Sequence, residues 1–499
     1  MARIVIIGAG MSGLATASRL ATLGHRVTVC EASGTYGGMV GRYERDGFAF
    51  DTGPGLLTLP AVYRDLALKT GREPLEELVE LAPVDPESRH LFPDGTDLLL
   101  PNASRGGVIQ ALDAAFGAGS GARWAGVMNH GRTVWEATRR PLLEEPLPAD
   151  PTPLHTDPYP APPRKGLARM FRPRPRTLAD VAAGELGGHP GLTALLEEYA
   201  LRFGLHAGTA PASATVLPYM EQSFGVWYVK GGIRALADAV YRRCEQRKVE
   251  FRFDTEVTSV VTEDGRARGV DTAAGRIDAD LVISSMDARV LLGRGIAEYP
   301  GGGDPALWGE HEEPNGRFTV LLALRGARPA AAAHRTVVHA TDPGAEWNAL
   351  TLGADLCERP TVQVLRPDDP SLRPDDDHES VVLTATVPGQ GDVDWTEPGL
   401  ADRYADRLLE HVDAAGLGLR GRVLWRVVRT PEDTRRETGA FMGAVPRPAL
   451  AGHGGHWLQS ANESPVPGLY LVGGAAHPGG GLARVGMSAC IAANLVGPA

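Results

Sequence analysis

Cysteine is scarce in this chain of 499 residues, which contains only Cys30, Cys244, Cys357 and Cys490. No two of them lie close together, so the sequence has neither the paired spacing typical of zinc ligands nor a framework for disulfide bonds. We therefore expect no metal centre. Thiols without partners are typical of a reducing compartment, which predicts a cytoplasmic protein.

Long apolar runs and an excess of positive charge are also missing. The sequence has no stretch of 18 uncharged apolar residues, so we expect no membrane-spanning helix. The chain runs directly into the apolar segment Arg3–Ile7, without the separate hydrophobic region and cleavage site of a signal peptide. The 50 basic and 61 acidic residues give a net charge of −11, which excludes general nucleic-acid binding as a function class.

Proline is concentrated in residues 141–175, which hold 11 prolines in 35 positions. This density excludes a regular helix or an internal strand and predicts a long loop or a lid. Residues 164–176 overlap its end and carry six basic side chains without an acidic one: Arg164, Lys165, Arg169, Arg172, Arg174 and Arg176. For this segment a solvated loop and a contact with anionic lipid or an anionic carrier both remain open.

The first 30 residues have the pattern of a strand–helix–strand unit. The β-branched runs Arg3–Ile7 and Arg26–Cys30 predict buried parallel strands, and residues 14–23 between them predict a helix. Further strands are predicted at Val249–Phe253, Glu256–Val261, Arg268–Thr272, Leu281–Ser284 and Phe318–Leu324. Two more helices are predicted near residues 400–415 and 485–496, the second beginning near Gly486.

A glycine-rich turn joins the first strand to the first helix. Gly8 permits a tight turn, Gly10 lets the backbone approach a pyrophosphate, and Gly13 lets the helix pack on the strand. The helix N-terminus then offers free N–H groups to phosphate. Glu31 follows Gly13 by 18 residues, close to the ~20 expected for the acid that binds a ribose. This pattern predicts a dinucleotide site.

Two further glycine groups favour FAD over NAD as the dinucleotide. One comprises Gly37-Gly38-Met39, Arg42 and Gly53-Pro54-Gly55, and follows closely after Glu31. The other is Gly473-Gly474 with Gly479–Gly481, far along the chain. Each group allows a close approach of backbone to a ligand, and three such groups exceed what a simple NAD domain requires. The sequence therefore predicts bound FAD. No cysteine or histidine lies in an evident flavin-linking motif, so we expect the FAD to be non-covalent.

Several strings together resemble bacterial phytoene desaturases, the carotenoid desaturases within the flavin amine oxidase superfamily. They are Ile-Gly-Ala-Gly-Met-Ser-Gly-Leu at 7–14, Phe-Asp-Thr-Gly-Pro at 50–54, Gly225–Gly232, Asp280–Ser285, and Gly-Leu-Tyr-Leu-Val-Gly-Gly-Ala-Ala-His-Pro-Gly-Gly-Gly at 468–481. The resemblance runs from residue 3 to about 496. Met39 stands where many relatives carry arginine, and Arg42 is the predicted substitute.

The resemblance implies an α/β fold, in which a Rossmann-like FAD-binding domain is assembled from discontinuous segments around an inserted α+β substrate domain. The FAD-binding parts are expected at 1–90, 236–300 and 446–499, and the substrate parts at 91–235 and 301–445. The residues expected to bind the cofactor are Gly8, Gly10, Met11, Ser12, Gly13, Glu31, Ala32, Gly37, Gly38, Met39, Arg42, Gly53, Pro54, Gly55, Val257, Gly473, Gly474, Gly486, Met487 and Ser488.

These features predict an FAD-dependent oxidoreductase that moves hydride from an apolar, polyene or isoprenoid substrate to the flavin. Such chemistry needs few charged side chains, and the sequence shows no acid–base, nucleophilic or metal constellation. His477 is the one candidate catalytic residue. The alternatives are an amine or heterocycle oxidase of secondary metabolism, a redox-neutral flavin isomerase, and a flavin-binding protein without turnover. An apolar small molecule is the expected partner, and the oligomeric state is left open.

Overall fold

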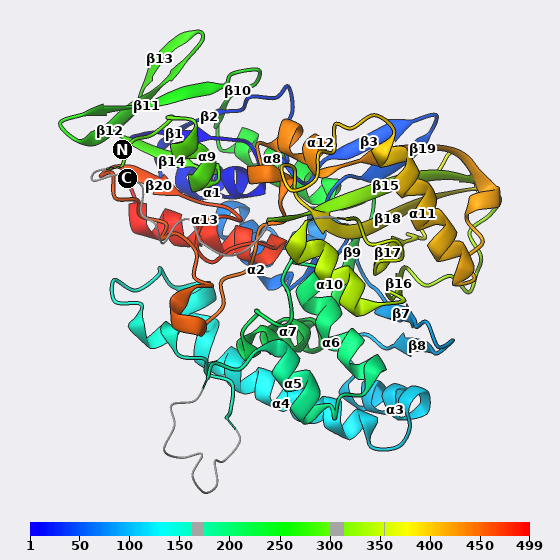
Figure 1. Cartoon of the computed structure of the whole chain (residues 1–499). Coiled ribbons are helices and arrows are strands. Elements are labelled where there is room, and N and C mark those ends of the chain that lie inside the picture. Colours follow the sequence, from blue (N-terminus) through cyan, green and yellow to red (C-terminus); the bar gives the residue numbers. More distant parts are fainter. Residues whose placement is uncertain (162–173, 300–313, 354) are drawn as a thin grey trace, which may run out of the picture.

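A computed structural model describes residues 1–161, 174–299, 314–353 and 355–499 (Figure 1). Its centre is a five-stranded sheet in the order β10-β2-β1-β14-β20, in which every neighbouring pair is parallel. The strands are β1 (Arg3–Ile7), β2 (Arg26–Cys30), β10 (Glu250–Arg252), β14 (Leu281–Ser284) and β20 (Leu469–Leu471). Three distant stretches of chain therefore build one Rossmann-like sheet, and the predicted discontinuous α/β fold is confirmed.

Both faces of this sheet are covered, as the alternation of side chains along β1 shows. Ile4 and Ile6 pack into a core with the helices of one face, while Val5 and Ile7 pack into a second core on the other. The helices of the first core are α1 (Met11–Thr22), α2 (Ala61–Gly71), α8 (Arg234–Gln246) and α13 (Leu482–Val496). The second core includes the antiparallel sheet of β11 (Val257–Glu263), β12 (Arg266–Thr272) and β13 (Gly275–Asp278), with α9 (Ala288–Gly293).

A seven-stranded sheet lies beside the Rossmann-like part, in the order β19-β15-β18-β17-β16-β7-β8. Only β16 and β7 pair in parallel; the other pairs are antiparallel. The strands are β7 (Ser88–Leu91), β8 (Asp97–Leu100), β15 (Asn315–Arg325), β16 (Arg335–Val338), β17 (Val362–Leu365), β18 (His378–Pro388) and β19 (Val423–Arg429). Helix α11 (Leu400–Ala414) covers one face, because Tyr404, Leu408 and Val412 form a stripe that packs on alternate residues of β15.

Helices form the lower part of the molecule in Figure 1 and share one core. They are α3 (Arg105–Phe116), α4 (Ser120–Arg139), α5 (Leu178–Glu185), α6 (Pro190–Leu201) and α7 (Val216–Phe224). The remaining elements are α10 (Pro343–Leu352), α12 (Pro431–Thr438) and two small sheets. One sheet pairs β3 (Arg42–Arg45) with β4 (Phe48–Asp51), and the other joins β5 (Leu57–Thr58), β9 (Val226–Val229) and β6 (Leu81–Pro83).

The predicted strands agree with the structure to within a few residues, but the start of the last helix was wrong. Helix α13 begins at Leu482, not near Gly486, with Gly481 as its N-cap. Gly486 lies inside the helix, where it serves packing: a Cβ there would lie 2.7 Å from Cγ1 of Val62 on α2. The proline-rich segment is largely irregular where it is described, although it opens with a π-helical turn at Arg140–Glu144.

The described residues test two further expectations only in part. Within the described ranges, no helix combines the length and apolar character needed to cross a membrane. Residues 162–173, which carry four of the six basic side chains of the 164–176 segment, lie outside the described residues. The division into cofactor and substrate domains stays a prediction.

Candidate cofactor and substrate site

The turn between β1 and α1 has the geometry expected of a dinucleotide-binding turn. Gly8 has a φ of +94°, and a Cβ there would lie 2.3 Å from Oγ of Ser285. A Cβ at Gly13 would lie 2.0 Å from the carbonyl oxygen of Gly8. Gly8 is favoured by its left-handed backbone, and Gly13 is required because a side chain there would separate α1 from the strand that precedes it. The turn thus places the N-terminus of α1 at the carboxyl end of β1.

The N-terminus of α1 is uncapped. Its N-cap is Gly10, which has no side chain to accept from the helix, and the first turn has no acidic residue. The first helical hydrogen bond of this turn runs from the amide of Leu14 to the carbonyl oxygen of Gly10, 2.9 Å away. The amides of Met11 and Ser12 therefore point past the helix end, with the positive end of the helix dipole behind them. This is a fitting place for a phosphate.

The second glycine group contacts the first through backbone atoms. The amide of Gly37 donates to the carbonyl oxygen of Ala9 at 2.8 Å. A Cβ on Gly38, whose φ is +57°, would lie 3.1 Å from Cα of Gly10. A Cβ on Gly53 would lie 1.9 Å from the carbonyl oxygen of Met39. Glycine at these positions lets two loops lie directly against each other at the end of α1.

Glu31 ends β2 beside this turn. One carboxylate oxygen accepts from the amide of Ala9 at 2.7 Å, and the other accepts from the amide and hydroxyl of Ser33 at 2.9 and 2.8 Å. The carboxylate therefore fixes the glycine turn as well as its own loop. The oxygen bonded to Ala9 can still accept a further hydrogen bond, as binding a ribose requires. Ala32 follows at an exposed position, and the backbone leading to Val257 passes alongside, since the amide of Thr255 donates to the carbonyl oxygen of Glu31 at 2.8 Å.

The third glycine group meets the same region after β20. Gly473 has a φ of +109°, and a Cβ there would lie 3.1 Å from Oγ of Ser12. The Oγ of Ser488 accepts from the amide of Gly473 at 3.1 Å, so this buried hydroxyl holds the loop rather than facing outward. Gly474 packs against Pro446, since a Cβ on this glycine would lie 2.5 Å from Cβ of the proline. The structure thus brings all three glycine groups together at the carboxyl edge of the parallel sheet.

His477 is fully buried in the loop that follows Gly474. Its Nε2 lies 3.0 Å from the carbonyl oxygen of Glu145, and Nδ1 has no hydrogen-bond partner. Burial lowers the pKa of His477 to about 4, so the ring is neutral near pH 7 and donates from Nε2. The side chain links the C-terminal loop to the segment after α4. A direct role in chemistry stays a prediction.

The other residues predicted to bind the cofactor make their contacts with neighbouring parts of the fold. The guanidinium of Arg42 donates to the carbonyl oxygen of Gly231 at 2.9 Å and pairs with Glu44. Pro54 precedes Gly55, where a Cβ would lie 2.6 Å from Cδ1 of Leu365 on the seven-stranded sheet. Met487 packs at the edge of the core around α1, one residue after Gly486 in α13. Their contact with a cofactor stays a prediction.

Sequence reasoning missed the residues that hold the second glycine group in place. The buried carboxylate of Asp51 accepts from the amides of Ile233 and Arg234, at 2.9 and 3.3 Å. Burial raises the pKa of Asp51 to about 6. The guanidinium of Arg234 donates to the carbonyl oxygen of Tyr36 at 2.7 Å and lies 4.2 Å from the centre of that ring. The available signal was the glycine pair 231–232, where a Cβ on Gly232 would lie 2.8 Å from Asp51.

A small cavity, of about 20 Å³, lies between the helical part and the C-terminal segment. Its walls come from α4 and the turn after it, from α7, and from residues 449–451, and most are apolar. The lining residues are Val134, Trp135, Thr138, Arg139, Leu142, Leu143, Ser213, Val216, Met220, Ala449, Leu450, Ala451 and Arg484. No residue in this set was predicted from the sequence, because the walls come from segments without a motif.

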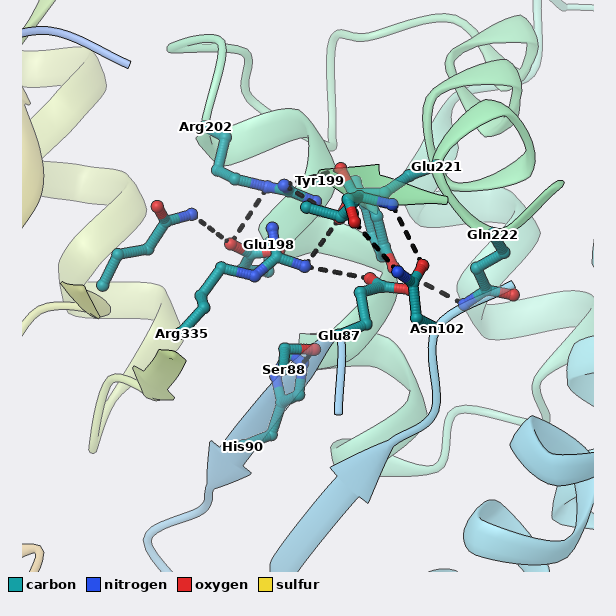
Figure 2. A network of polar contacts seen from close by, with 12 residues as sticks. Glu87, Ser88, His90, Asn102, Glu198, Tyr199, Arg202, Glu221, Gln222 and Arg335 are labelled. Carbon is teal, nitrogen blue, oxygen red and sulfur yellow. Dashed lines mark hydrogen bonds and ion pairs between the residues drawn. The ribbon is translucent and has the colours of Figure 1, made fainter. Parts of the chain in front are cut away.

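A buried ionic network lies in the helical part, close to the seven-stranded sheet (Figure 2). The guanidinium of Arg335 contacts Glu221 at 2.6 Å and Glu87 at 2.9 Å. Arg202 contacts the other oxygen of Glu221 at 2.9 Å and Glu198 at 3.1 Å. Each buried cation therefore has two carboxylates as partners.

The two central carboxylates of this network have opposite pKa shifts. Burial, reinforced by the neighbouring Glu221, raises the pKa of Glu87 to about 8. Burial alone would also raise the pKa of Glu221, but Arg202 and Arg335 lower it to about 2. At neutral pH a protonated Glu87 therefore lies beside an ionised Glu221. The two cations are thus balanced by the ionised carboxylates of the network inside the fold.

Comparison with known proteins agrees with the cofactor site that this geometry suggests. The chain matches the family model described as flavin containing amine oxidoreductase over residues 11–497. All-trans-zeta-carotene desaturase of Myxococcus xanthus is 30% identical, over 98% of this chain and 92% of the relative. 4,4'-Diapolycopene oxygenase of Methylomonas sp is 27% identical, over 97% and 96%. A neurosporene-forming phytoene desaturase of Cereibacter sphaeroides is 27% identical, over 99% and 94%.

Solved structures share the fold at lower identity. An oxidoreductase from Methanosarcina mazei superposes with a TM-score of 0.64 and 18% identity, over 98% of this chain and 99% of the other. A putrescine oxidase superposes with a TM-score of 0.65 and 15% identity, over 99% of each chain. At these identities the likeness concerns the fold alone, and the chemistry must be argued from the site.

Proposed function

Because the chain belongs to the family of flavin containing amine oxidoreductases, and is a flavin-dependent enzyme, we propose that it binds FAD without a covalent link and dehydrogenates a polyene or isoprenoid substrate. The observation that carries this proposal is the meeting of three glycine groups at the uncapped end of α1. The relatives that cover nearly the whole chain are named as carotenoid desaturases and oxygenases.

FAD fits these residues better than a shorter flavin. The amides at the start of α1 supply a phosphate site, and Glu31 lies at the end of the next strand for a ribose. The loops around Gly38 and Gly473 extend the surface on either side of Gly10 and Ser12. An adenine dinucleotide would use all of these contacts, whereas a mononucleotide would leave the ribose site unfilled.

The state of the thiols supports non-covalent binding. Burial raises the pKa of Cys30 to about 11 and that of Cys490 above its ordinary value, so both are protonated near pH 7. The Sγ of the buried Cys244 contacts the carbonyl oxygen of Leu14 at 3.2 Å. A thiolate is the nucleophilic form of cysteine, and protonated thiols are poor at forming a link to the flavin. His477 is engaged through Nε2 and buried.

The bound flavin would supply the hydride acceptor, which is the part of the chemistry that side chains cannot provide. The chain would bind the substrate, hold one carbon at reacting distance and exclude water. Apolar walls such as Leu142, Val216 and Leu450 suit that task. Among the described residues near the glycine groups, His477 is the one titratable side chain predicted to act, and it is neutral and braces a loop.

The proposal is tested by anaerobic stopped-flow spectroscopy of the purified yellow protein. Phytoene or zeta-carotene in detergent should bleach the flavin, and mass spectrometry should find a product lighter by two hydrogens for each new double bond. Acid precipitation should release FAD into the supernatant. Bleaching by putrescine but not by the polyenes would favour an amine oxidase instead. A product of unchanged mass would favour an isomerase, and no bleaching by any substrate would favour a flavin-binding protein without turnover.

We also propose that the enzyme meets its substrate at the inner face of a membrane, because a polyene dissolves in lipid. The basic segment 164–176 is the candidate contact, although two of its charges are already paired. Arg174 pairs with Asp180 at 2.6 Å, and Arg176 pairs with Glu185 at 3.0 Å. Flotation with anionic liposomes at low salt tests the contact. Equal recovery with neutral liposomes would contradict it.

A further inference from the structure

Arg484 is a buried cation without an acidic partner. It is the third residue of α13, and only 8% of its surface is exposed. Among the described residues, its guanidinium makes one side-chain hydrogen bond, to Sδ of Met220 on α7, 3.7 Å away, and a thioether is a weak acceptor. In the described part of the chain no carboxylate lies within ion-pair distance of it. A guanidinium carries five N–H donors, so most of its hydrogen-bonding capacity is unused.

The guanidinium of Arg484 stays protonated although it is buried. Burial lowers its pKa to about 10, which still leaves the side chain protonated near pH 7. Holding an unpaired charge away from water costs free energy, and folded proteins normally offset that cost with a paired charge or a ligand. Arg317 is half-buried, and among the described residues it also has no carboxylate partner, but it donates to the carbonyl oxygen of Arg202 at 3.1 Å and does not line the cavity.

Arg484 lines the apolar cavity described above, where the hydroxyl groups and the other guanidinium are engaged elsewhere. The hydroxyls of Ser213 and Thr138 donate to backbone carbonyl oxygens, at 2.6 and 2.7 Å. The other cavity arginine, Arg139, is about half exposed and pairs with Glu144 at 3.2 Å. The guanidinium of Arg484 is therefore the strong hydrogen-bond donor that the cavity offers to a ligand.

The end of α13 adds to the positive field at this place. Its N-cap, Gly481, has no side chain to cap the helix, and the first turn has no acidic residue. The Nη1 of Arg484 lies 3.8 Å from the position that a Cβ on Gly481 would take. A helix N-terminus and a guanidinium side by side both favour a negative charge. The described residues provide no such charge here.

We propose that Arg484 binds a carboxylate at one end of the substrate, and that the small cavity holds this end group while the long apolar body extends out of it. The inference rests on the proposed function. It narrows the substrate class from any polyene or isoprenoid to one that ends in a carboxylic acid. A carboxylate matches the planar fork of a guanidinium with two parallel hydrogen bonds. The apolar walls at Val134, Leu143 and Val216 suit the carbons next to the carboxylate. The position of Met220 on α7 places the guanidinium on the cavity side of α13.

The test compares two probes that differ only in their end group, retinoic acid and retinol, by isothermal titration calorimetry with the oxidised holoprotein. Wild-type protein should bind retinoic acid at least about 10-fold more tightly, as expected for a charge-assisted hydrogen bond. Arg484→Met should remove this preference, and Arg484→Lys should keep part of it. Bound FAD and circular dichroism confirm that each variant is folded.

Arg243→Gln is the matched control. Arg243 is as buried as Arg484, but it pairs with Glu73 at 2.6 Å and lines a different cavity. This variant should keep the full preference for retinoic acid. Equal affinity of wild-type protein for the two probes would overturn the proposal. An Arg484→Met variant that keeps the preference for retinoic acid would also overturn it. If the midpoint potential of the flavin shifts in that variant, the guanidinium interacts with the flavin instead of with the substrate.

Binding is measured without turnover, so the two proposals fail separately. If the preference depends on Arg484 but no polyene bleaches the flavin, the carboxylate site stands and the dehydrogenase function fails. If neutral polyenes are dehydrogenated rapidly and retinoic acid binds no better than retinol, the function stands and the carboxylate site fails.

Discussion

Two buried arginines that contact α7 differ in what surrounds them. Arg335 contacts two carboxylates at 2.6 and 2.9 Å, whereas Arg484 contacts a thioether at 3.7 Å. Their partners on α7 are neighbours in sequence, Glu221 for the first and Met220 for the second. Burial alone therefore does not reveal the role of a charge. A compensated cation supports the fold, and an uncompensated one beside a cavity is available to a ligand.

The positions of the two arginines fit these roles. The network around Arg335 joins the segment before β7, helix α7 and strand β16, which are far apart in sequence (Figure 2). It locks the helical part onto the seven-stranded sheet. Arg484 lies on α13, which packs on α1 of the Rossmann-like part. Its guanidinium extends from there into the apolar cavity.

The largest expected effect is on stability. Arg335→Met should lower the free energy of unfolding by about 3–5 kcal/mol, because it leaves Glu221 buried with one of its two cations removed. Urea unfolding of the holoprotein measures this. The matched variant Arg484→Met should show no such loss. Equal destabilisation by the two variants would remove the distinction between them.

A second prediction concerns pH and Glu87, which faces Glu221, Arg335 and Arg202. Its pKa is raised from 4.5 to about 8 in the folded protein, so its contribution to stability is complete below pH 4.5 and is lost as the pH rises towards 8. Glu87→Gln mimics the protonated acid and should flatten this dependence, by at most about 1.4 kcal/mol per pH unit. Unfolding curves between pH 5 and 8 give the slopes. Parallel slopes would show that Glu87 does not titrate in this range.

A third prediction concerns Glu31, a charged residue at the cofactor site that can be compared with the two arginines. Glu31→Ala should weaken FAD binding about 10- to 100-fold, because a charge-assisted hydrogen bond to the ribose is worth roughly 1.5–3 kcal/mol. The protein should stay folded, although the turn at Ala9 loses an acceptor. Fluorescence titration of the apoprotein with FAD measures the dissociation constant. An unchanged constant would place the ribose elsewhere.

His477 should have the smallest effect on chemistry. A neutral ring that braces the carbonyl oxygen of Glu145 is a structural group, so His477→Ala should slow flavin reduction by less than about 10²-fold, the lower limit for a general base. Anaerobic stopped-flow bleaching measures the rate. A greater loss with FAD still bound would make His477 catalytic and favour a polar, amine-like substrate.

The sequence predicted the features that depend on local pattern. The β-branched runs of β1, β2 and β14 mark buried parallel strands, Gly8 has a left-handed backbone, and Gly13 is needed where the backbone leaves no room for a Cβ. The start of α13 was misjudged, because the run Gly479–Gly481 is typical of a loop and Gly486 of a helix boundary. In the fold, Gly486 is required by its contact with α2.

Features that depend on distant contacts left little local signal in the sequence. Glu87 and Arg335 are 248 residues apart, and nothing near either predicts their pairing. Asp51 and Arg234 are 183 residues apart, and the glycine pair 231–232 was the one sign of their contact. Arg484 had one signal, a positive charge in the first turn of a helix, where the dipole disfavours it. That signal becomes visible only once the helix is known to begin at Leu482.

The most direct test of the difference between the two arginines measures unfolding with and without a carboxylate ligand. Retinoic acid at about 100 times its dissociation constant should raise the unfolding free energy of wild-type holoprotein by about 2.7 kcal/mol. At the same concentration the rise should be much smaller in Arg484→Met and unchanged in Arg243→Gln. An equal rise in wild type and Arg484→Met would contradict the conclusion that an uncompensated buried arginine marks the substrate's carboxylate site.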